Sequence, residues 1–267
     1  MPLKERIKSA MIIALTIYLL LISLLFIFQR KIQYLPTGQI LSLKSYGLDN
    51  FSEQIINLED GIKIFSWYKK SIRADNKIIL YLHGNSGNLG DRSYRYNVFA
   101  ERGYGVLAIS YRGYRKSTGK PSEEGLIKDG SAALEFLYNN GYKASDVMLY
   151  GESLGSGVAI QIAAKENFNL LVLESPYSSI ASVAQKNYWY APINLLLKDK
   201  FESIKYAPKI KTPTIIFHGK KDNVVSYKEG QKLFNSLNIK KDLIFDDNLG
   251  HVDFDPNFVI NEIERFN

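Results

Sequence analysis

The sequence contains no cysteine and only three histidines, His83, His218 and His251. Without cysteine there can be no disulfide, thiolate metal site or cysteine nucleophile, and the redox compartment stays open. With so few histidines, the choice of a general base is narrow. The net charge is +7, but the sequence has no dense Lys/Arg tract, so nucleic acid is not an expected partner.

One long hydrophobic run is present near the N-terminus. Residues 9–28 carry no charge and consist mainly of Ile, Leu, Phe, Ala and Tyr. A helix of this length spans roughly 30 Å, the thickness of the hydrocarbon core of a bilayer. The alternative is a cleaved signal peptide, but residues 26–30 offer no small-x-small cleavage site. We therefore expect residues 1–30 to form a tail and a single-pass membrane anchor.

Positive residues are equally frequent on the two sides of this run. Three precede it and three follow it: Lys4, Arg6, Lys8, Arg30, Lys31 and Lys44. A short tail with three cations slightly favours a cytoplasmic tail, which would place the main domain outside the cytoplasm. A mildly basic protein is also suited to an anionic lipid surface.

The rest of the chain, residues 31–267, is expected to form one domain in which strands alternate with helices. An Asp-Gly turn between residues 54–58 and 62–67 predicts a hairpin. Apolar runs then predict strands at 78–82, 106–110, 147–150, 170–173, 214–217 and 243–245, with helices at 91–102, 122–140, 154–165, 227–237 and 257–265. Unbroken apolar strands alternating with helices indicate an α/β protein with a mostly parallel central sheet flanked by helices.

Residues 177–211 interrupt this alternation. They include Tyr177, Tyr188, Trp189, Tyr190 and a run of three leucines at 195–197. An aromatic-rich segment inserted after a central strand predicts a cap over a pocket. The alternative is that these residues complete the core.

The pentapeptide at 151–155, Gly-Glu-Ser-Leu-Gly, has the form G-x-S-x-G and lies between a predicted strand and a predicted helix. In that context the motif is typical of a nucleophile elbow. The alternative interpretation of the motif is an ordinary glycine-rich turn. The turn is so tight that a Cβ on a flanking residue would collide with its neighbours. Ser153 is therefore the predicted nucleophile, at a helix N-terminus that favours negative charge.

A serine hydroxyl needs a base to take its proton, and the base in turn needs an acid to orient it. In this architecture the chain order is nucleophile, acid, histidine, which His251 satisfies. Asp222, after the strand at 214–217, is the predicted acid, and Glu174, at the end of the preceding strand, is the alternative. His83 and His218 are expected to hold their own turns by hydrogen bonds.

An oxyanion hole requires two backbone N–H groups. One is expected from Leu154, directly after the nucleophile. The other is expected from the loop after the strand at 78–82, where Asn85 or Ser86 could supply it. Gly84 and Gly87 would let this backbone approach a substrate closely.

These motifs resemble those of membrane-anchored α/β-hydrolase-domain proteins, a subgroup related to depalmitoylating thioesterases and serine aminopeptidase-like hydrolases. The matching stretches lie at 83–88, 111–114, 119–123, 151–155, 174–176, 218–222 and 250–251. Arg115 stands where the subgroup usually has glycine. The depalmitoylating members carry a cysteine-rich N-terminus, which this chain lacks.

The resemblance and the predicted triad together imply a serine hydrolase of esters or thioesters that needs no cofactor and no metal. Ser153 would form an acyl-enzyme, His251 would shuttle the proton and Asp222 would orient the histidine. A membrane anchor at residues 9–28 and an aromatic cap favour a small-molecule substrate of the acyl or lipid type. The alternatives are a peptidase or amidase of the same fold and a non-catalytic binding module.

Overall fold

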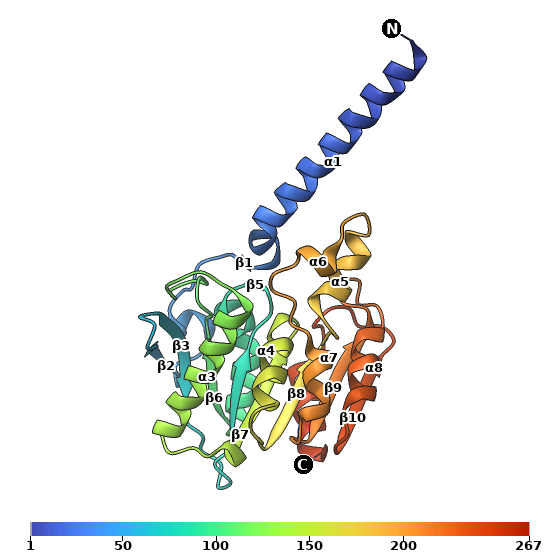
Figure 1. Cartoon of the computed structure of the whole chain (residues 1–267). Helices are drawn as coiled ribbons and strands as arrows, with labels where there is room; N and C mark the ends of the chain where they lie inside the picture. The colour runs from blue at the N-terminus through green and yellow to red at the C-terminus, as the bar shows by residue number, and fades with distance from the viewer. Residues whose placement is uncertain (1, 267) are drawn as a thin grey trace.

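The computed structural model describes residues 2–266 and has an eight-stranded sheet at its centre (Figure 1). The strand order is β10-β9-β8-β7-β4-β6-β3-β2, and only the pairs β2–β3 and β3–β6 are antiparallel. The strands are β2 (Ser52–Asn57), β3 (Lys63–Lys69), β4 (Ile78–Leu82), β6 (Gly105–Ile109), β7 (Val147–Glu152), β8 (Leu170–Glu174), β9 (Thr214–Gly219) and β10 (Lys241–Asp246). This sheet confirms the predicted α/β fold class and the predicted hairpin.

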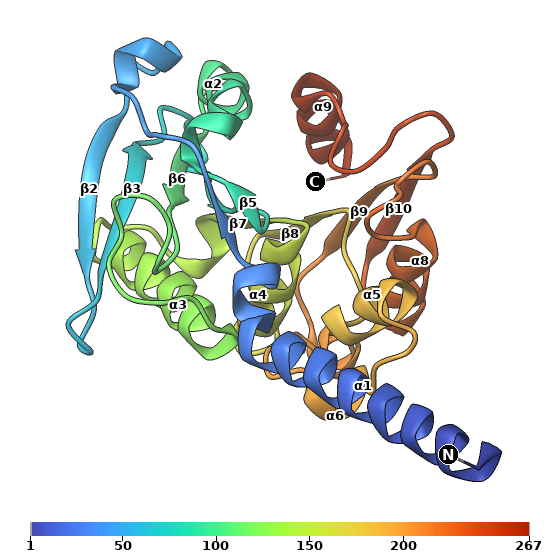
Figure 2. The same cartoon turned by 90° about the horizontal axis from the view of Figure 1, so that it is seen from above.

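Helices cover both faces of the sheet (Figure 2). The helices α2 (Ser93–Glu101) and α9 (Pro256–Phe266) lie on one face, and α3 (Glu123–Asn139), α4 (Leu154–Ala163) and α8 (Tyr227–Ser236) lie on the other. Because both faces are covered, every residue of β4, β6 and β8 is buried. Continuous apolar strands are therefore the expected pattern here.

Local signals set the helix ends. Ser122 caps α3, as predicted, and its Oγ accepts a hydrogen bond from the Gly125 amide at 3.1 Å. The helix predicted at 91–102 is instead a 3-10 turn, η2 (Leu89–Arg92), followed by α2. The reason is a reciprocal cap: the Asn88 side chain accepts from the Gly90 amide, and Asp91 accepts from the Asn88 amide, both at 2.8 Å.

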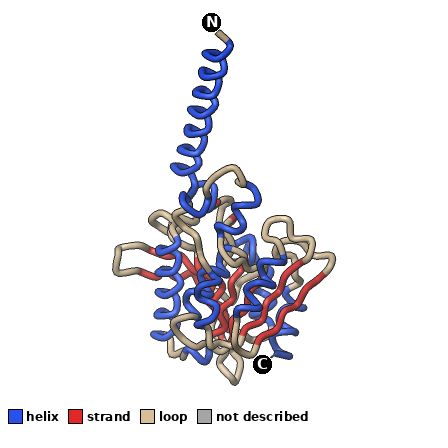
Figure 3. The backbone as a smooth tube through the Cα atoms, turned by 45° about the vertical axis from the view of Figure 1, so that its right-hand side comes forward, coloured by secondary structure: helices blue, strands red, loops and turns tan. Residues whose placement is uncertain are grey.

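The helix α1 (Leu3–Gln33) projects from the domain (Figures 1 and 3). Its 31 residues extend for about 46 Å at 1.5 Å per residue. It is long and apolar enough to cross a membrane, and its apolar part is not buried by the rest of the protein. Its C-terminal half, from Tyr18 onward, contacts the domain. After the helix, β1 (Leu35–Pro36) pairs with β5 (Ser86–Gly87).

The segment at 177–211 divides into two parts. The helices α5 (Ile180–Asn187) and α6 (Ile193–Leu196) lie at the end of the domain from which α1 projects (Figure 1). Their small apolar cluster is separate from the main core. The later part, with α7 (Ser203–Tyr206) and η4 (Ala207–Lys209), places Phe201, Ala207 and Ile210 in the main core. The remaining short elements are η1 (Leu43–Tyr46) and η3 (Ala144–Asp146).

Candidate active site

Ser153 occupies the turn between β7 and α4, with φ 48° and ψ −112°. A positive φ is strained for a residue with a side chain and persists only where the surroundings hold it. Here the Ser153 amide donates to the carbonyl of Glu174 at 2.9 Å. The Ser153 carbonyl accepts from the amide of Ser156 at 2.9 Å and from its hydroxyl at 2.6 Å. The strained conformation is thus tied to both β8 and α4.

The two glycines of the motif are required by close backbone contacts. A Cβ at position 155 would lie 1.9 Å from the carbonyl oxygen of Leu82, and one at position 151 would lie 2.6 Å from the Cα of Ser156. No side-chain movement relieves a clash with backbone. The predicted reason for both glycines is confirmed.

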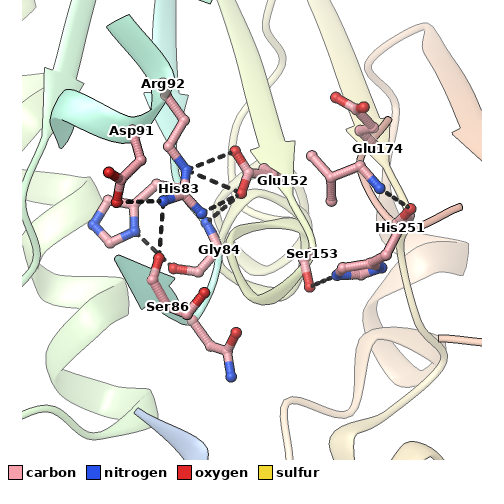
Figure 4. Close-up of polar contacts among 12 residues, drawn as sticks. His83, Gly84, Ser86, Asp91, Arg92, Glu152, Ser153, Glu174 and His251 are labelled. Atoms are coloured by element: carbon pink, nitrogen blue, oxygen red, sulfur yellow. Dashed lines mark hydrogen bonds and ion pairs between the residues drawn. The ribbon is translucent and has the colours of Figure 1, made fainter. Parts of the chain in front are cut away.

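The structure brings Ser153, His251 and Asp222 together at the carboxyl ends of β7 and β9 (Figure 4 shows the first two). Ser153 Oγ lies 2.9 Å from His251 Nε2, and His251 Nδ1 lies 2.7 Å from Asp222 Oδ2. The second Asp222 oxygen accepts from the amides of Val224 and Val225, at 2.9 and 2.8 Å. All four contacts fall within hydrogen-bonding distance.

Asp222 is buried but held in its charged form. Burial raises the pKa of its carboxyl, but hydrogen bonds from His218 and His251 outweigh burial and hold this pKa well below its usual range. The carboxylate is therefore an anion at neutral pH, and an anion beside Nδ1 favours the tautomer whose Nε2 is free to accept a proton.

The other two histidines hold their own turns, as predicted. His218 Nε2 lies 2.9 Å from the carbonyl of Val225 and 3.4 Å from Asp222, so it supports the acid rather than contacting Ser153. His83 Nδ1 lies 2.7 Å from the carbonyl of Gly84.

Glu174, the alternative acid, is engaged elsewhere. Its carboxylate pairs with Arg95 through bonds of 2.7 and 3.1 Å and also accepts from the Tyr150 hydroxyl. Arg95 in turn donates to the carbonyls of Val252 and Phe254, at 2.9 and 3.3 Å. The ion pair therefore positions the loop that carries His251. Sequence reasoning missed Arg95, whose only signal is a cation on the buried face of a helix.

Glu152, the variable residue before Ser153, connects the elbow to the loop after β4. Its carboxylate accepts from the Tyr81 hydroxyl at 2.6 Å. It also accepts from the Gly84 amide at 3.2 Å and from Arg92 at 2.7 Å (Figure 4). Burial raises its pKa, but the charge of Arg92 outweighs burial and lowers the pKa to about 2. This buried anion fixes the loop that carries Asn85, and it too was not foreseen from the sequence.

Asn85 and Leu154, whose backbone amides are the expected oxyanion donors, line the same cavity as Ser153. Among residues 2–266, the backbone amides of Asn85 and Leu154 donate no hydrogen bond. The backbone of Asn85 is held in place because its carbonyl, on the far side of the residue from its amide, accepts from the Leu35 amide at 2.9 Å and from the Tyr114 hydroxyl at 2.7 Å. Two fixed amides that point at no protein acceptor can bind a developing negative charge without reorganisation.

Two cavities reach Ser153. One, of about 280 Å³, is largely apolar and is enclosed by the C-terminal part of α1 and by α5 and α6; its walls include Phe26, Ile32, Val183 and Leu196. We call it the acyl cavity. The other, of about 270 Å³, is lined mainly by polar side chains such as Asp91, Arg92, Arg95 and His251. We call it the polar cavity.

His83 is expected to make the fold sensitive to acid. Burial, and secondarily the charge of Arg92, lowers its pKa from 6.5 to about 4. In the unfolded chain His83 is protonated as the pH falls below about 6.5, whereas in the folded chain it is protonated only near pH 4. The free energy of unfolding therefore decreases as the pH falls through this window. The difference corresponds to about 3 kcal/mol across the whole window.

The test is urea unfolding in detergent at pH 7 and pH 5, with His83→Asn as the comparison. The asparagine amide nitrogen can replace Nδ1 but does not titrate. We expect the wild type to lose more stability on acidification than the variant. Equal losses would contradict the assignment of this acid sensitivity to His83.

The sheet order, the strained serine at the end of β7 and the histidine loop after β10 are those of an α/β-hydrolase. Residues 73–207, half of the chain, match the family model described as serine aminopeptidase, S33, and the chain belongs to this family of α/β-hydrolases. A putative alpha/beta hydrolase L404 of Acanthamoeba polyphaga mimivirus is 32% identical over 87% of this chain and 88% of its own length.

Two further comparisons concern proteins with described activities. The lysophosphatidylserine lipase ABHD12 of Danio rerio is 31% identical over 63% of this chain, which spans about half (49%) of that relative. A solved structure of the Pyrococcus furiosus esterase Pf2001 superposes with a TM-score of 0.69 at 22% identity, covering 87% of this chain and 96% of the esterase. The predictions of an α/β-hydrolase fold and of a hydrolase are confirmed.

Proposed function

We propose that the protein is a membrane-anchored serine hydrolase that cleaves an ester or thioester of an acyl substrate through an acyl-enzyme. The observation that carries this proposal is the continuous chain of contacts from Asp222 through His251 to Ser153, with Ser153 held in a strained turn. In this arrangement the Nε2 atom of His251 lies where it can accept the serine proton.

Ser153 Oγ attacks the acyl carbonyl carbon while its proton moves to His251 Nε2. The carbonyl oxygen becomes an anion, which the amides of Asn85 and Leu154 stabilise. Collapse of this intermediate breaks the bond to the leaving alcohol or thiol, which takes the proton from His251. Water then attacks the acyl-enzyme with His251 again as base, releasing the acid and restoring Ser153.

The two cavities favour a substrate with one apolar and one polar end. The acyl chain would occupy the acyl cavity, since its walls are mainly aliphatic and aromatic side chains. The leaving group would face the polar cavity, beside Asp91 and Arg92. The names of two similar proteins, an esterase and a lysophosphatidylserine lipase, agree with a lipid-like ester.

We further propose that residues 1–30 are a tail and membrane anchor, residues 31–267 the hydrolase domain and residues 177–211 its cap. The length and apolar surface of α1 support the anchor. The three cations of the tail, Lys4, Arg6 and Lys8, favour a hydrolase domain on the non-cytoplasmic side. Protection of that domain from protease in intact cells would contradict this orientation.

Fluorophosphonate labelling of membranes that contain the full chain tests the proposed nucleophile. A fluorophosphonate forms a covalent bond only with an activated serine, so we expect the wild type to be labelled and Ser153→Ala not to be. The exposed Ser131 lies on α3, and Ser131→Ala is the matched control that should label like the wild type. Labelling of Ser153→Ala would refute the assignment.

A further inference from the structure

The part of the cap next to α1 has an unusual surface. Residues 188–197, which we call the cap tip, run Tyr-Trp-Tyr-Ala-Pro-Ile-Asn-Leu-Leu-Leu without a charge. Trp189 is 77% exposed, Leu195 81% and Tyr190 42%. Large apolar side chains gathered on one exposed segment mark a surface that contacts a partner or a membrane.

The cap tip runs alongside the apolar part of α1. The Tyr18 hydroxyl donates to the carbonyl of Tyr190 at 3.0 Å. Further along, Ile22 packs against the cluster formed by Ala181, Ala191 and Ile193. Two segments far apart in the sequence therefore present one continuous apolar surface, and Figure 2 shows α1 passing beside α5 and α6.

The charged ends of the two segments also coincide. The Lys198 amide donates to the Gln29 side chain at 2.7 Å, and Arg30 forms a bidentate pair with Asp199 at 2.7 and 3.0 Å. Gln29 and Arg30 directly follow the apolar run of α1, and Lys198 directly follows the cap tip. The polar boundary is thus at the same level on both segments.

The helix geometry gives the depth of the cap tip. Phe28 is the last residue of the apolar run. Ile22 lies six residues before it, which is about 9 Å along the helix axis, and Tyr18 lies about 15 Å from Phe28 along the same axis. If the cap tip stayed in water, only residues 9–18, about 15 Å of helix, would remain for a hydrocarbon core of roughly 30 Å. Residues 9–28 can fill the core only if the cap tip enters it.

An apolar hollow lies between α1 and α6 on the outer surface. It is lined by Ile22, Ser23, Phe26, Ile27 and Leu196. Phe26 and Leu196 also line the acyl cavity, so the hollow and the cavity adjoin across these two side chains. At the depth of Ile22 this hollow would face lipid chains.

We propose that the cap tip is a second membrane contact, whose partner is the lipid of the leaflet nearest the hydrolase domain. Acyl substrates then reach Ser153 laterally from the bilayer, between Phe26 and Leu196. The insertion rests on the proposed membrane anchor, and the route of access rests also on the proposed hydrolase activity. Lys186 and Lys198 flank the cap tip, and their flexible side chains can extend to the headgroups.

Tryptophan fluorescence tests the insertion directly, because the chain has two tryptophans and Trp67 is fully buried in the core. The full chain is placed in phosphatidylcholine vesicles, with and without bromine on the acyl chains. We expect brominated lipid to quench a large part of the wild-type emission and aqueous iodide to quench little. Trp189→Phe should lose the quenching by brominated lipid. Quenching of Trp189 by iodide and not by brominated lipid would overturn the insertion.

A paired activity assay tests the route of access. Trp189→Glu/Leu195→Glu is expected to lower hydrolysis of a long-chain acyl lipid in vesicles by about tenfold or more, because carboxylates are costly in the bilayer. Hydrolysis of water-soluble p-nitrophenyl acetate should be unchanged. Ile72→Glu is the matched control: this exposed apolar residue precedes the amino end of β4, whereas Ser153 lies at the carboxyl end of β7, and the substitution should change neither activity.

The two assays separate the possible failures. Unchanged lipid hydrolysis in the double variant, or equal losses on both esters, would overturn the route of access. Undiminished hydrolysis by Ser153→Ala would instead overturn the proposed catalytic function, while the fluorescence result would still decide whether the cap tip is inserted.

Discussion

Alanine at Ser153 or at His251 is expected to lower kcat/KM for ester hydrolysis by on the order of 10⁴- to 10⁶-fold, and alanine at both to lower it hardly further. The reason is that the two groups act as one unit. Ser153 Oγ lies 2.9 Å from His251 Nε2, so the hydroxyl is a nucleophile only while the imidazole can take its proton. Once either member is lost, the other has nothing to act on.

The measurement is steady-state hydrolysis of a p-nitrophenyl ester by the two single variants and the double variant. Near-ultraviolet circular dichroism serves as the control for folding, since both side chains lie at the surface of the cavities rather than in the core. Losses that multiply in the double variant would show that the two residues act independently and would contradict the proposed mechanism.

Replacing Arg95 by methionine is expected to destabilise the fold by about 3–5 kcal/mol, because it leaves the Glu174 carboxylate buried and unpaired. The two side chains are 1% and 0% exposed. Arg95 also holds the carbonyls of Val252 and Phe254, so the folded variant should lose activity through a displaced His251. The measurement is urea unfolding in detergent, followed by kinetics under conditions where the variant is folded.

Arg102→Met is the matched control for this experiment. Arg102 directly follows the same helix and pairs with Glu264 at 3.2 Å, but its side chain is 38% exposed, so its loss should cost under about 1 kcal/mol. The double variant Arg95→Met/Glu174→Gln should recover part of the stability, since no unpaired charge remains, but not the activity. Equal effects of Arg95→Met and Arg102→Met would contradict the positioning role of Arg95.

The helix α1 has more than one consequence for the hydrolase. Its C-terminal part forms a wall of the acyl cavity, and Gln33 donates to the carbonyl of Asp199 while its own carbonyl accepts from Asn85. The residue whose backbone amide is expected to bind the oxyanion is thus bonded, through its side chain, to the helix expected to cross the membrane. The proposed membrane attachment and the shape of the site are therefore structurally connected.

Several features were accessible from the sequence because they are local. The elbow is recognisable from its own strand–turn–helix pattern: Gly151 is required by a backbone contact with Ser156 inside this unit, and Ser122 caps the helix that begins at the next residue. The clash that excludes a side chain at Gly155 is with Leu82 of the neighbouring strand β4. Apolar runs predicted the strands, since a strand buried on both faces can contain little else. Even so, a reciprocal cap around Asn88 shortened the helix predicted from residue 91.

What only the tertiary structure decided depends on side chains that are distant in sequence. Asp222 was the predicted acid and Glu174 the alternative. The structure distinguishes them because Arg95, on the helix α2, pairs with Glu174, whereas Asp222 contacts His251. The acyl cavity likewise arises only where α1 meets α5 and α6, a contact between residues more than 160 positions apart. Periodicity records whether a residue is buried but not which residue it meets, because packing partners are chosen by the topology of the whole chain.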